Sequence, residues 1–206
     1  MAHIPDGVLS APVLIAGATV TLTLVSVALR RLDYDRLPQA AVLAATFFVS
    51  SLLNIPLGPS SVHLLLNGLM GLMLGWTAVP AILVALALQA AFFGFGGILV
   101  LGVNTMNMAV PALFCMALLA PWLRRLPAGR AFWVGAAAGM SGVMLTGLMV
   151  ALTLGLSGQA FVPAAKVLVL IYLPLALVEA VITGAVIGFL MRVAPEFLPT
   201  GGHTHA

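Results

Sequence analysis

Residues 131–155 read AFWVGAAAGMSGVMLTGLMVALTLG and contain no charged side chain. A helix of about 20 mainly apolar residues is long enough to cross the hydrocarbon core of a bilayer. The whole chain has the same character, because 63% of its 206 residues are hydrophobic and 6% are charged. Soluble domains carry about 25% charged residues, so this chain lacks the polar side chains that would cover a water-facing surface. The sequence therefore predicts a protein that lies in a membrane.

Further apolar segments lie on both sides of this run, and the third and fourth are separated by Gly75 and Pro80. Their lengths are typical of helices that cross a bilayer, although the third is short. We expect an all-α integral membrane protein with about seven transmembrane helices, which form a single transmembrane domain over residues 1–206. The candidate spans are 9–29, 38–55, 62–75, 79–95, 105–122, 131–155 and 166–191.

The arginines predict the orientation of these helices. Membrane proteins keep an excess of Arg and Lys on the cytoplasmic side, and all the arginines fall there if the N-terminus is outside. We therefore expect residues 1–8 to be extracellular and residues 193–206 to form a cytoplasmic tail, in the inner (cytoplasmic) membrane. The first residues lack the basic start of a signal peptide, so the first span should stay in the mature protein. The arginines are Arg30, Arg31, Arg36, Arg124, Arg125, Arg130 and Arg192, and Lys166 alone falls outside.

The composition argues against several other classes of protein. The basic residues are too few and too dispersed to form a stripe that binds the phosphates of a nucleic acid. Cys115 is the only cysteine, so neither a disulfide framework nor a thiolate cluster can form. The chain also has no G-x-x-x-x-G-K-[ST] loop, and any ATP hydrolysis of that type is expected from another subunit.

His3 lies near the start of the chain in Met1-Ala2-His3-Ile4-Pro5-Asp6-Gly7. A terminal amine, a deprotonated backbone amide and an imidazole this close together can form fused chelate rings, and such an all-nitrogen, tetragonal set suits Ni(II) or Cu(II). Pro5 and Gly7 turn the chain, which would let the segment fold back into the helix bundle. The simpler alternative is a histidine on a frayed chain end.

Four other polar residues could take part in such a site. His63 opens the third segment on the same predicted side as His3, and it could supply another nitrogen or only a hydrogen bond at the interface. Asn104 and Asn107 follow a glycine-rich break and could hydrogen-bond a loop that lies on them. Glu179 is the only acid inside a predicted span, where it could orient a metal-binding histidine or form a structural hydrogen bond.

With these residues in place, the chain resembles the CbiM/NikM family over nearly its whole length. Members of this family are the substrate-specificity (S) components of energy-coupling-factor (ECF) importers for nickel and cobalt, which are ABC transporter complexes. Each matching string is weak alone, but four occur in order on a seven-span topology. They are His3-Ile4-Pro5-Asp6-Gly7, Ser60-Ser61-Val62-His63-Leu64-Leu65, the string from Phe93 to Met108, and Val178-Glu179 through Thr183-Gly184.

The resemblance implies a metal site made of the terminal amine, the backbone nitrogen and imidazole of His3, and the imidazole of His63. Family members usually begin Met-His, whereas Ala2 intervenes here, so two registers are possible. If Met1 is removed, Ala2 supplies the amine and His63 completes the set. If Met1 is retained, its amine, two amides and the His3 imidazole could fill four positions without His63. We expect the mature chain to start at Ala2.

The resemblance also implies the partners: a transmembrane coupling (T) subunit, cytoplasmic ATPase subunits, often a small accessory membrane subunit, and the lipid bilayer. Ni2+ or Co2+ is expected as the transported substrate, with a lean towards nickel from Pro5-Asp6-Gly7, and no organic cofactor is expected.

Two alternatives to this function stay open. Gly139-Met140-Ser141-Gly142 is similar to the nucleophile motif of rhomboid proteases and could indicate an intramembrane serine hydrolase. That chemistry needs a histidine base, and the histidines after Ser141, His203 and His205, lie in the predicted tail. The other alternative is a vitamin-binding S component.

Overall fold

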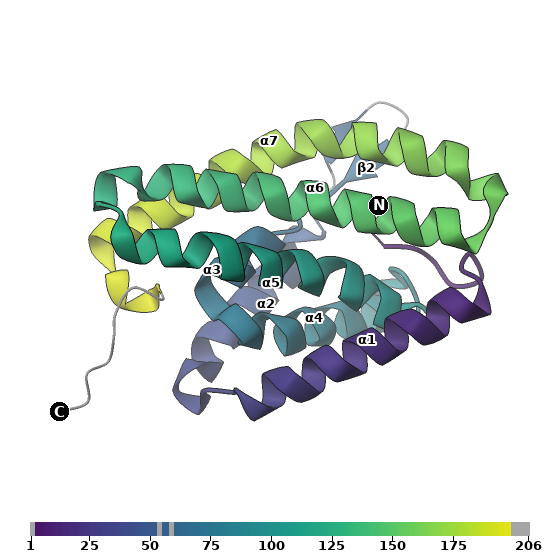
Figure 1. The fold of residues 1–206 in the computed structure, drawn as a ribbon, viewed down its shortest axis with the longest axis horizontal. Coiled ribbons are helices and arrows are strands. Elements are labelled where there is room, and N and C mark those ends of the chain that lie inside the picture. The colour runs from purple at the N-terminus through teal and green to yellow at the C-terminus, as the bar shows by residue number, and fades with distance from the viewer. Residues whose placement is uncertain (1–2, 53–54, 58–59, 199–206) are drawn as a thin grey trace.

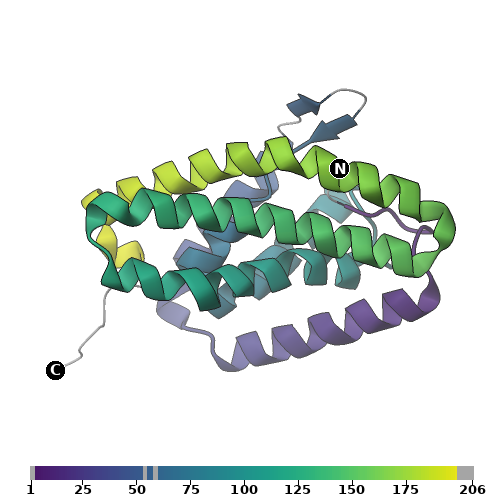
Figure 2. The same ribbon diagram turned by 45° about the horizontal axis from the view of Figure 1, so that its top comes forward.

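The computed structural model describes residues 3–52, 55–57 and 60–198, which form a bundle of α-helices with one small β-hairpin (Figure 1). Short 3₁₀ turns connect several of the helices: η1 (Tyr34–Arg36), η2 (Gly75–Thr77), η3 (Ala128–Arg130), η4 (Gln159–Phe161) and η5 (Pro195–Phe197). The helices are α1 (Ala11–Arg30), α2 (Leu37–Ser50), α3 (Asn67–Leu74), α4 (Ala78–Phe93), α5 (Leu101–Arg125), α6 (Ala131–Ser157) and α7 (Val162–Val193). The antiparallel strands β1 (Ile55–Leu57) and β2 (Ser60–Val62) form the hairpin, which Figure 2 shows projecting from the bundle beside α7.

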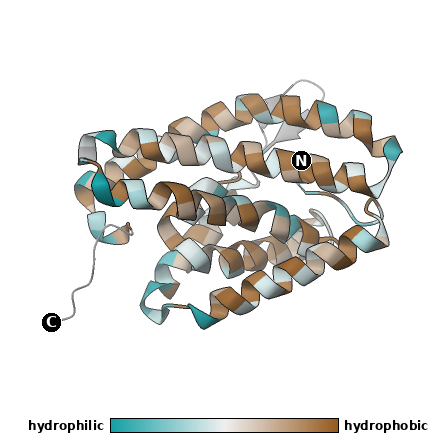
Figure 3. Ribbon diagram, viewed as in Figure 1, coloured by the Kyte–Doolittle hydropathy of each residue, from teal (hydrophilic) through white to brown (hydrophobic). Residues whose placement is uncertain are grey.

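The predicted class, an all-α membrane protein, is confirmed. Within the described residues, five helical stretches are long and apolar enough to cross a membrane: Ala11–Arg30, Asn67–Phe93, Leu101–Arg125, Ala131–Ser157 and Gln159–Val193. The chain is therefore a multi-pass membrane protein. Hydrophobic residues cover most of the long helices, while hydrophilic ones gather towards the ends of the bundle (Figure 3). The predicted number of seven transmembrane helices stays a prediction, because α2 has only 14 residues and α3 and α4 together make up one of the five stretches.

The contacts of α3 and α4 show that the chain reverses direction between them. α3 starts just after His63, and the chain then reaches Trp76, whose ring lies 4.9 Å below the guanidinium of Arg31 at the end of α1. α4 returns towards the other end of the bundle, where Phe95 stacks on the ring of His3. We call the end near His3 and Phe95 the histidine end of the bundle, and the end near Arg31 and Trp76 the arginine end.

α3 is short, with backbone of positive φ at Leu66 before it and at Gly75 after it, and it is enclosed on all sides. All eight of its residues are buried, and two of its glycines touch the backbones of neighbouring helices. A Cβ atom on Gly68 would lie 2.2 Å from the carbonyl oxygen of Ala138 on α6, and one on Gly71 would lie 2.1 Å from that of Ala112 on α5. Small residues allow this close approach of backbones in membrane proteins. The two glycines therefore let α3 pack tightly against α5 and α6.

α6 and α7 pack against each other along most of their length (Figures 1 and 2). Gly135 and Gly139 on α6 make this possible, since a Cβ atom on them would lie within 3 Å of the backbone carbonyls of Thr183 and Glu179 on α7. Because α3 stops at Leu74, a cavity of about 490 Å³ remains at the arginine end of the bundle. Residues lining this cavity include Arg31, Arg36, Trp76, Met116 and Arg124.

Candidate metal site

The two histidines singled out in the sequence meet inside the bundle. The rings of His3 and His63 are stacked, with centroids 5.0 Å apart and an angle of 18° between their planes. Both side chains are buried, with exposed fractions of 6% and 2%. His3 reaches this position because the segment before α1 runs from the end of the bundle back towards its middle, as Figures 1 and 2 show in purple. His63 lies in the irregular segment between β2 and α3.

Three of the four ring nitrogens have no hydrogen-bond partner among the described residues: Nδ1 and Nε2 of His3, and Nε2 of His63. The fourth, Nδ1 of His63, lies 3.0 Å from the carbonyl oxygen of Leu64. A carbonyl oxygen only accepts, so Nδ1 of His63 carries the proton and Nε2 is left with a free lone pair. Buried polar nitrogens without a partner are costly, and a bound metal ion would remove that cost.

The surroundings keep both imidazoles in the form that binds metals. Burial, together with the nearby His63, lowers the pKa of His3 to about 3. Burial also lowers the pKa of His63, although the bond to Leu64 acts in the opposite direction. Metal ions bind the neutral imidazole, and these shifts make it the dominant form at neutral pH.

Side chains alone do not complete a metal site here. Among the residues that the structure describes, no three His, Cys, Asp or Glu side chains come close enough together to hold a metal ion. Two imidazoles need further ligands, which the sequence predicts to be the terminal amine and a backbone nitrogen. Met1 and Ala2, the candidates for the amine, lie outside the described residues.

Asn104, near the start of α5, holds the backbone of the N-terminal segment. Its Oδ1 accepts a hydrogen bond from the N–H of Ile4, and its Nδ2 donates to the carbonyl oxygen of the same residue, each at 3.1 Å. Ile4 follows His3 directly, so Asn104 fixes the segment next to the candidate ligand. The sequence-based prediction that this asparagine hydrogen-bonds a loop lying on it is confirmed.

Asp6 provides a second attachment, which the sequence analysis missed. Its N–H donates to the carbonyl oxygen of Gly96 at 3.3 Å, and its Oδ1 accepts from the N–H of Val100 at 3.0 Å, just before α5. The carboxylate occupies space that a side chain at Gly97 would fill, since a Cβ atom there would lie 2.1 Å from Cγ of Asp6. The adjacent glycines 96 and 97 were the signal in the sequence that another part of the chain comes close.

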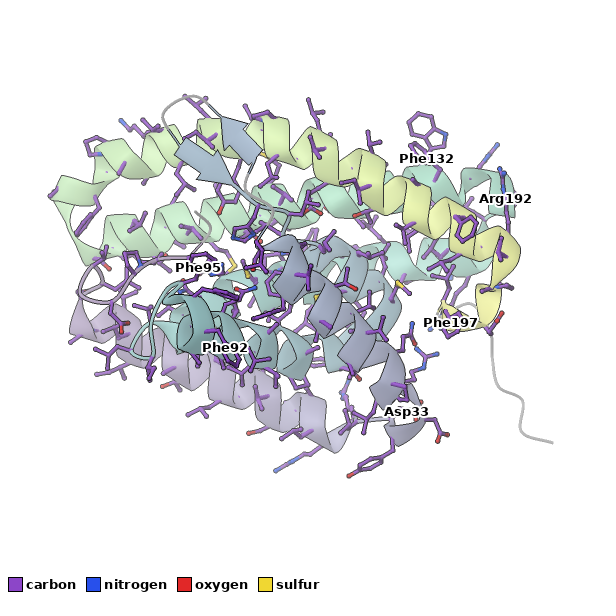
Figure 4. The ribbon with its side chains drawn as sticks, turned by 180° about the vertical axis from the view of Figure 1, so that it is seen from behind. Asp33, Phe92, Phe95, Phe132, Arg192 and Phe197 are labelled. Atoms are coloured by element: carbon purple, nitrogen blue, oxygen red, sulfur yellow. The ribbon has the colours of Figure 1, made fainter. Side chains whose placement is uncertain are left out.

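Phe95 closes one side of the histidine pair. Its ring stacks on that of His3 at a centroid distance of 6.1 Å and an angle of 11°. Figure 4 shows Phe95 beside the loop that follows α4, near Phe92. An aromatic ring at this position excludes water from one face of the imidazole.

Comparison with known proteins agrees with this geometry. The CbiM family profile, described as "Cobalt uptake substrate-specific transmembrane region", matches residues 3–197. The chain belongs to the CbiM family. The resemblance inferred from the sequence is thereby confirmed, and the match includes both His3 and His63.

The chain is similar to several named members of the CbiM family. It is 39% identical to a "Putative metal transport protein" of Haemophilus influenzae, over 95% of this chain and 96% of that protein. It is 35% identical to the "Fused nickel transport protein NikMN" of Rhodobacter capsulatus, over 97% of this chain but 60% of that longer protein. A crystal structure described as a truncated transition metal transporter aligns with a TM-score of 0.80 and 27% identity, and covers 92% of this chain and 98% of that one.

The two remaining residues singled out in the sequence, Asn107 and Glu179, bond groups other than the histidine rings in this CbiM-family chain. Asn107 donates to the hydroxyl of Thr153 at 3.4 Å, and no bond from it to the N-terminal segment occurs among the described residues. Glu179 accepts hydrogen bonds from the backbone N–H groups of Leu65 and Leu66, in the segment that carries His63.

Ser141, the centre of the alternative hydrolase hypothesis, donates to the carbonyl oxygen of Ala137 at 2.6 Å, one turn earlier in α6. Its hydroxyl also lies 3.5 Å from the sulfur of Cys115. His203 and His205 lie outside the described residues, so the structure does not place them relative to this serine.

Proposed function

We propose that this chain is the metal-binding S component of an ECF-type ABC importer that takes up Ni2+, or Co2+, across the cytoplasmic membrane. The observation that carries the proposal is the buried pair His3 and His63, whose ring nitrogens are mostly unpartnered within the described residues. Membership of a family described as a cobalt uptake region gives this pair a context of metal transport.

The ligand chemistry favours nickel as the substrate. The proposed ligands are the terminal amine, the backbone nitrogen and imidazole of His3, and Nε2 of His63, and a nitrogen set of this kind suits tetragonal Ni(II). Relatives of the chain carry both metals in their names, nickel in Rhodobacter capsulatus and cobalt in the "Cobalt transport protein CbiM" of Sorangium cellulosum. The metal ion is the transported substrate in this proposal, and we propose no organic cofactor.

The orientation follows from the charges. We propose that the histidine end faces outside and that the arginine end faces the cytoplasm, where the excess of Arg and Lys belongs. In this orientation α1 to α7 cross seven times; α2 and α3 are short, and the neighbouring helices enclose α3. The N-terminal segment then meets metal ions on the outer side, and residues 193–206 lie inside the cell.

The energy for transport is proposed to come from partners, namely a transmembrane T subunit and cytoplasmic ATPase subunits, with a small accessory membrane subunit as a further candidate. The absence of a phosphate-binding G-x-x-x-x-G-K-[ST] string from the sequence supports this division of labour. We do not propose an enzyme, because the hydroxyl of Ser141 is engaged with its own helix. A vitamin-binding S component is disfavoured by the paired imidazoles.

The test is metal analysis of protein purified with a C-terminal tag, so that the N-terminus stays free. We expect one Ni2+ or Co2+ per chain, and we expect His63→Ala to abolish high-affinity binding, because water would replace one of four nitrogen ligands. A matched variant that lacks His203 and His205 should bind the metal nearly as well as the wild type. If the tail variant loses the metal while His63→Ala retains it, the proposed site is wrong.

A further inference from the structure

Glu179 is a carboxyl group in the middle of α7, and it is fully buried. Burying such a group among apolar helices is expensive, so it should have a defined role. Its Oε1 accepts two hydrogen bonds, from the backbone N–H of Leu65 and, at 2.9 Å, from that of Leu66. Both donors lie in the irregular segment between His63 and α3, which is the segment that positions one of the two imidazoles.

One peptide unit connects this carboxyl group with the ring of His63. The N–H of Leu65 belongs to the same peptide unit as the carbonyl of Leu64. That carbonyl accepts the hydrogen bond from Nδ1 of His63 at 3.0 Å, while the N–H on its other side donates to Glu179. The atoms therefore form a continuous series: imidazole N–H, carbonyl oxygen, amide N–H and carboxyl oxygen.

We propose that Glu179 is the positioning residue for His63, and that it acts through the peptide unit of Leu64 and Leu65 to fix the tautomer and the direction of the ring. This inference rests on the proposed function, since it assigns a role to His63 as a metal ligand. Glu179 does not touch the metal in this arrangement. It orients His63, which is the proposed ligand.

The physical basis is the cooperativity of hydrogen bonds in a dry environment. A carboxyl oxygen that accepts from the amide polarises the peptide unit, and this makes the carbonyl of Leu64 a stronger acceptor. A stronger acceptor holds the proton on Nδ1 of His63, which leaves the lone pair on Nε2 and makes that nitrogen a better donor to a metal. Metal-binding histidines commonly have a carboxylate or a backbone carbonyl on the other ring nitrogen, and here the two occur in series.

Glu179 also stabilises an unfavourable backbone conformation in the same segment. Leu66 has a φ angle of +48°, and it is the one non-glycine residue with positive φ in the part of the chain that the structure describes. The left-handed region is strained for a leucine, so the segment needs an external hold. The two N–H groups bound to Oε1, those of Leu66 and of the residue before it, provide this hold.

The close packing of α6 and α7 keeps the carboxyl group in place. A Cβ atom on Gly139 would lie 2.4 Å from the carbonyl oxygen of Glu179, so the α7 backbone lies directly against α6 at this level. The carboxyl group is therefore presented to Leu65 and Leu66 by two long helices rather than by a loop. Rigid support of this kind is what a precise ligand geometry requires.

The experiment compares Glu179→Ala, Glu179→Gln and a control on the same helix, Thr183→Val. Thr183 is also fully buried, one turn further along α7, and its hydroxyl has no partner among the described residues. The first readout uses metal-free protein labelled with ¹⁵N-histidine, with the His63 signals assigned by their loss in His63→Ala. We expect Nδ1 of His63 to be the protonated nitrogen in the wild type, in Glu179→Gln and in Thr183→Val. Glu179→Ala should give a mixture of tautomers.

The second readout is Ni2+ binding, measured by titration and by the visible ligand-field spectrum. Loss of an outer hydrogen-bond partner of a metal ligand typically weakens binding by about 10- to 100-fold, and this is the loss expected for Glu179→Ala, with a shifted spectrum. Glu179→Gln retains an acceptor oxygen and should stay within about tenfold of the wild type. Thr183→Val should match the wild type, and a folded state of each variant is checked by its unfolding temperature.

The proposal is overturned if Glu179→Ala keeps both the wild-type tautomer and the wild-type spectrum. It is also overturned if Glu179→Gln loses as much affinity as Glu179→Ala, because the charge and not the acceptor geometry would then matter. Since the tautomer is measured without metal, this outcome is distinct from failure of the proposed function, which His63→Ala would reveal by retaining the metal.

Discussion

Replacing Asn104 by alanine removes both hydrogen bonds that hold the backbone of Ile4 to α5. Ile4 is only 4% exposed, so its N–H and C=O cannot turn freely to water while the segment stays docked. Each lost hydrogen bond costs about 1 kcal/mol, and each buried group left unpaired costs about 1–3 kcal/mol. With two groups affected, we expect docking of the N-terminal segment to weaken by about 2–6 kcal/mol.

This loss should appear as weaker metal binding, because His3 can bind together with His63 only when the segment is docked. A change of about 1.4 kcal/mol corresponds to tenfold in an equilibrium constant, so the upper limit is a loss of affinity of about 10⁴-fold. Asp6 keeps its own two bonds and holds part of the population docked. The apparent affinity is the intrinsic affinity multiplied by the fraction of chains whose segment stays docked, and we expect a decrease of about tenfold or more.

The assay is Ni2+ titration of Asn104→Ala beside Asn107→Ala, with hydrogen exchange of the segment before α1 as a second measurement. Asn107 is a fair control, since it is another buried asparagine on α5 but bonds Thr153 at 3.4 Å and not the N-terminal segment. Asn104→Ala should lose affinity and protection together, whereas Asn107→Ala should lose little of either. Equal effects of the two substitutions, or unchanged binding by Asn104→Ala, would refute the idea that Asn104 docks the segment.

Four further predictions concern the segment and the topology. Gly97→Ala should displace the carboxylate of Asp6 and weaken metal binding, whereas Gly94→Ala, with φ of +65° and nothing within 4 Å, should cost only about 1 kcal/mol of stability. Comparing the Ni2+ affinities and unfolding temperatures of the two variants checks this. A reporter fused to the C-terminus should be active only in the cytoplasm, and activity in the periplasm would contradict the proposed orientation. Acetylation or extension of the N-terminus should abolish tight binding, because an amide nitrogen is a poorer ligand than an amine. Intact mass spectrometry should show a chain that starts at Ala2.

Much of the architecture could be predicted from the sequence because lipid imposes a simple rule. A long apolar run without charges becomes a helix, and the runs at 131–155 and 166–191 correspond to α6 and α7 within a few residues. The boundaries near 51–66 could not be predicted in the same way. There apolar residues such as Leu52 and Leu64 lie on both sides of a polar turn and were assigned to the neighbouring helices, but the chain forms a hairpin and an irregular segment, so α2 ends at Ser50 and α3 begins only at Asn67.

The histidines and the hold from Asn104 could be predicted, but the holds from Asp6 and Glu179 could not. The rarity of histidines and their position on the same predicted side point to His3 and His63 as a pair. The bonds of Asp6 go to backbone atoms of residues 96 and 100; glycines 96 and 97 indicate that some part of the chain comes close, but not which part. Glu179 was noticed for its charge, yet only the structure showed that it accepts from Leu65 and Leu66.

Both candidate ligands lie on the least regular parts of a mainly helical chain, and each is held by a polar side chain from a long helix. Asn104 of α5 binds the backbone beside His3, and Glu179 of α7 binds the backbone beyond His63. Neither side chain bonds an imidazole nitrogen directly. A donor group placed on the unprotonated nitrogen would compete with the metal for its lone pair, whereas a hold on the backbone fixes the ring and leaves that nitrogen free. The unpartnered nitrogens of His3 and His63 follow from that arrangement: the bundle determines where the rings lie, and coordination is left to the metal.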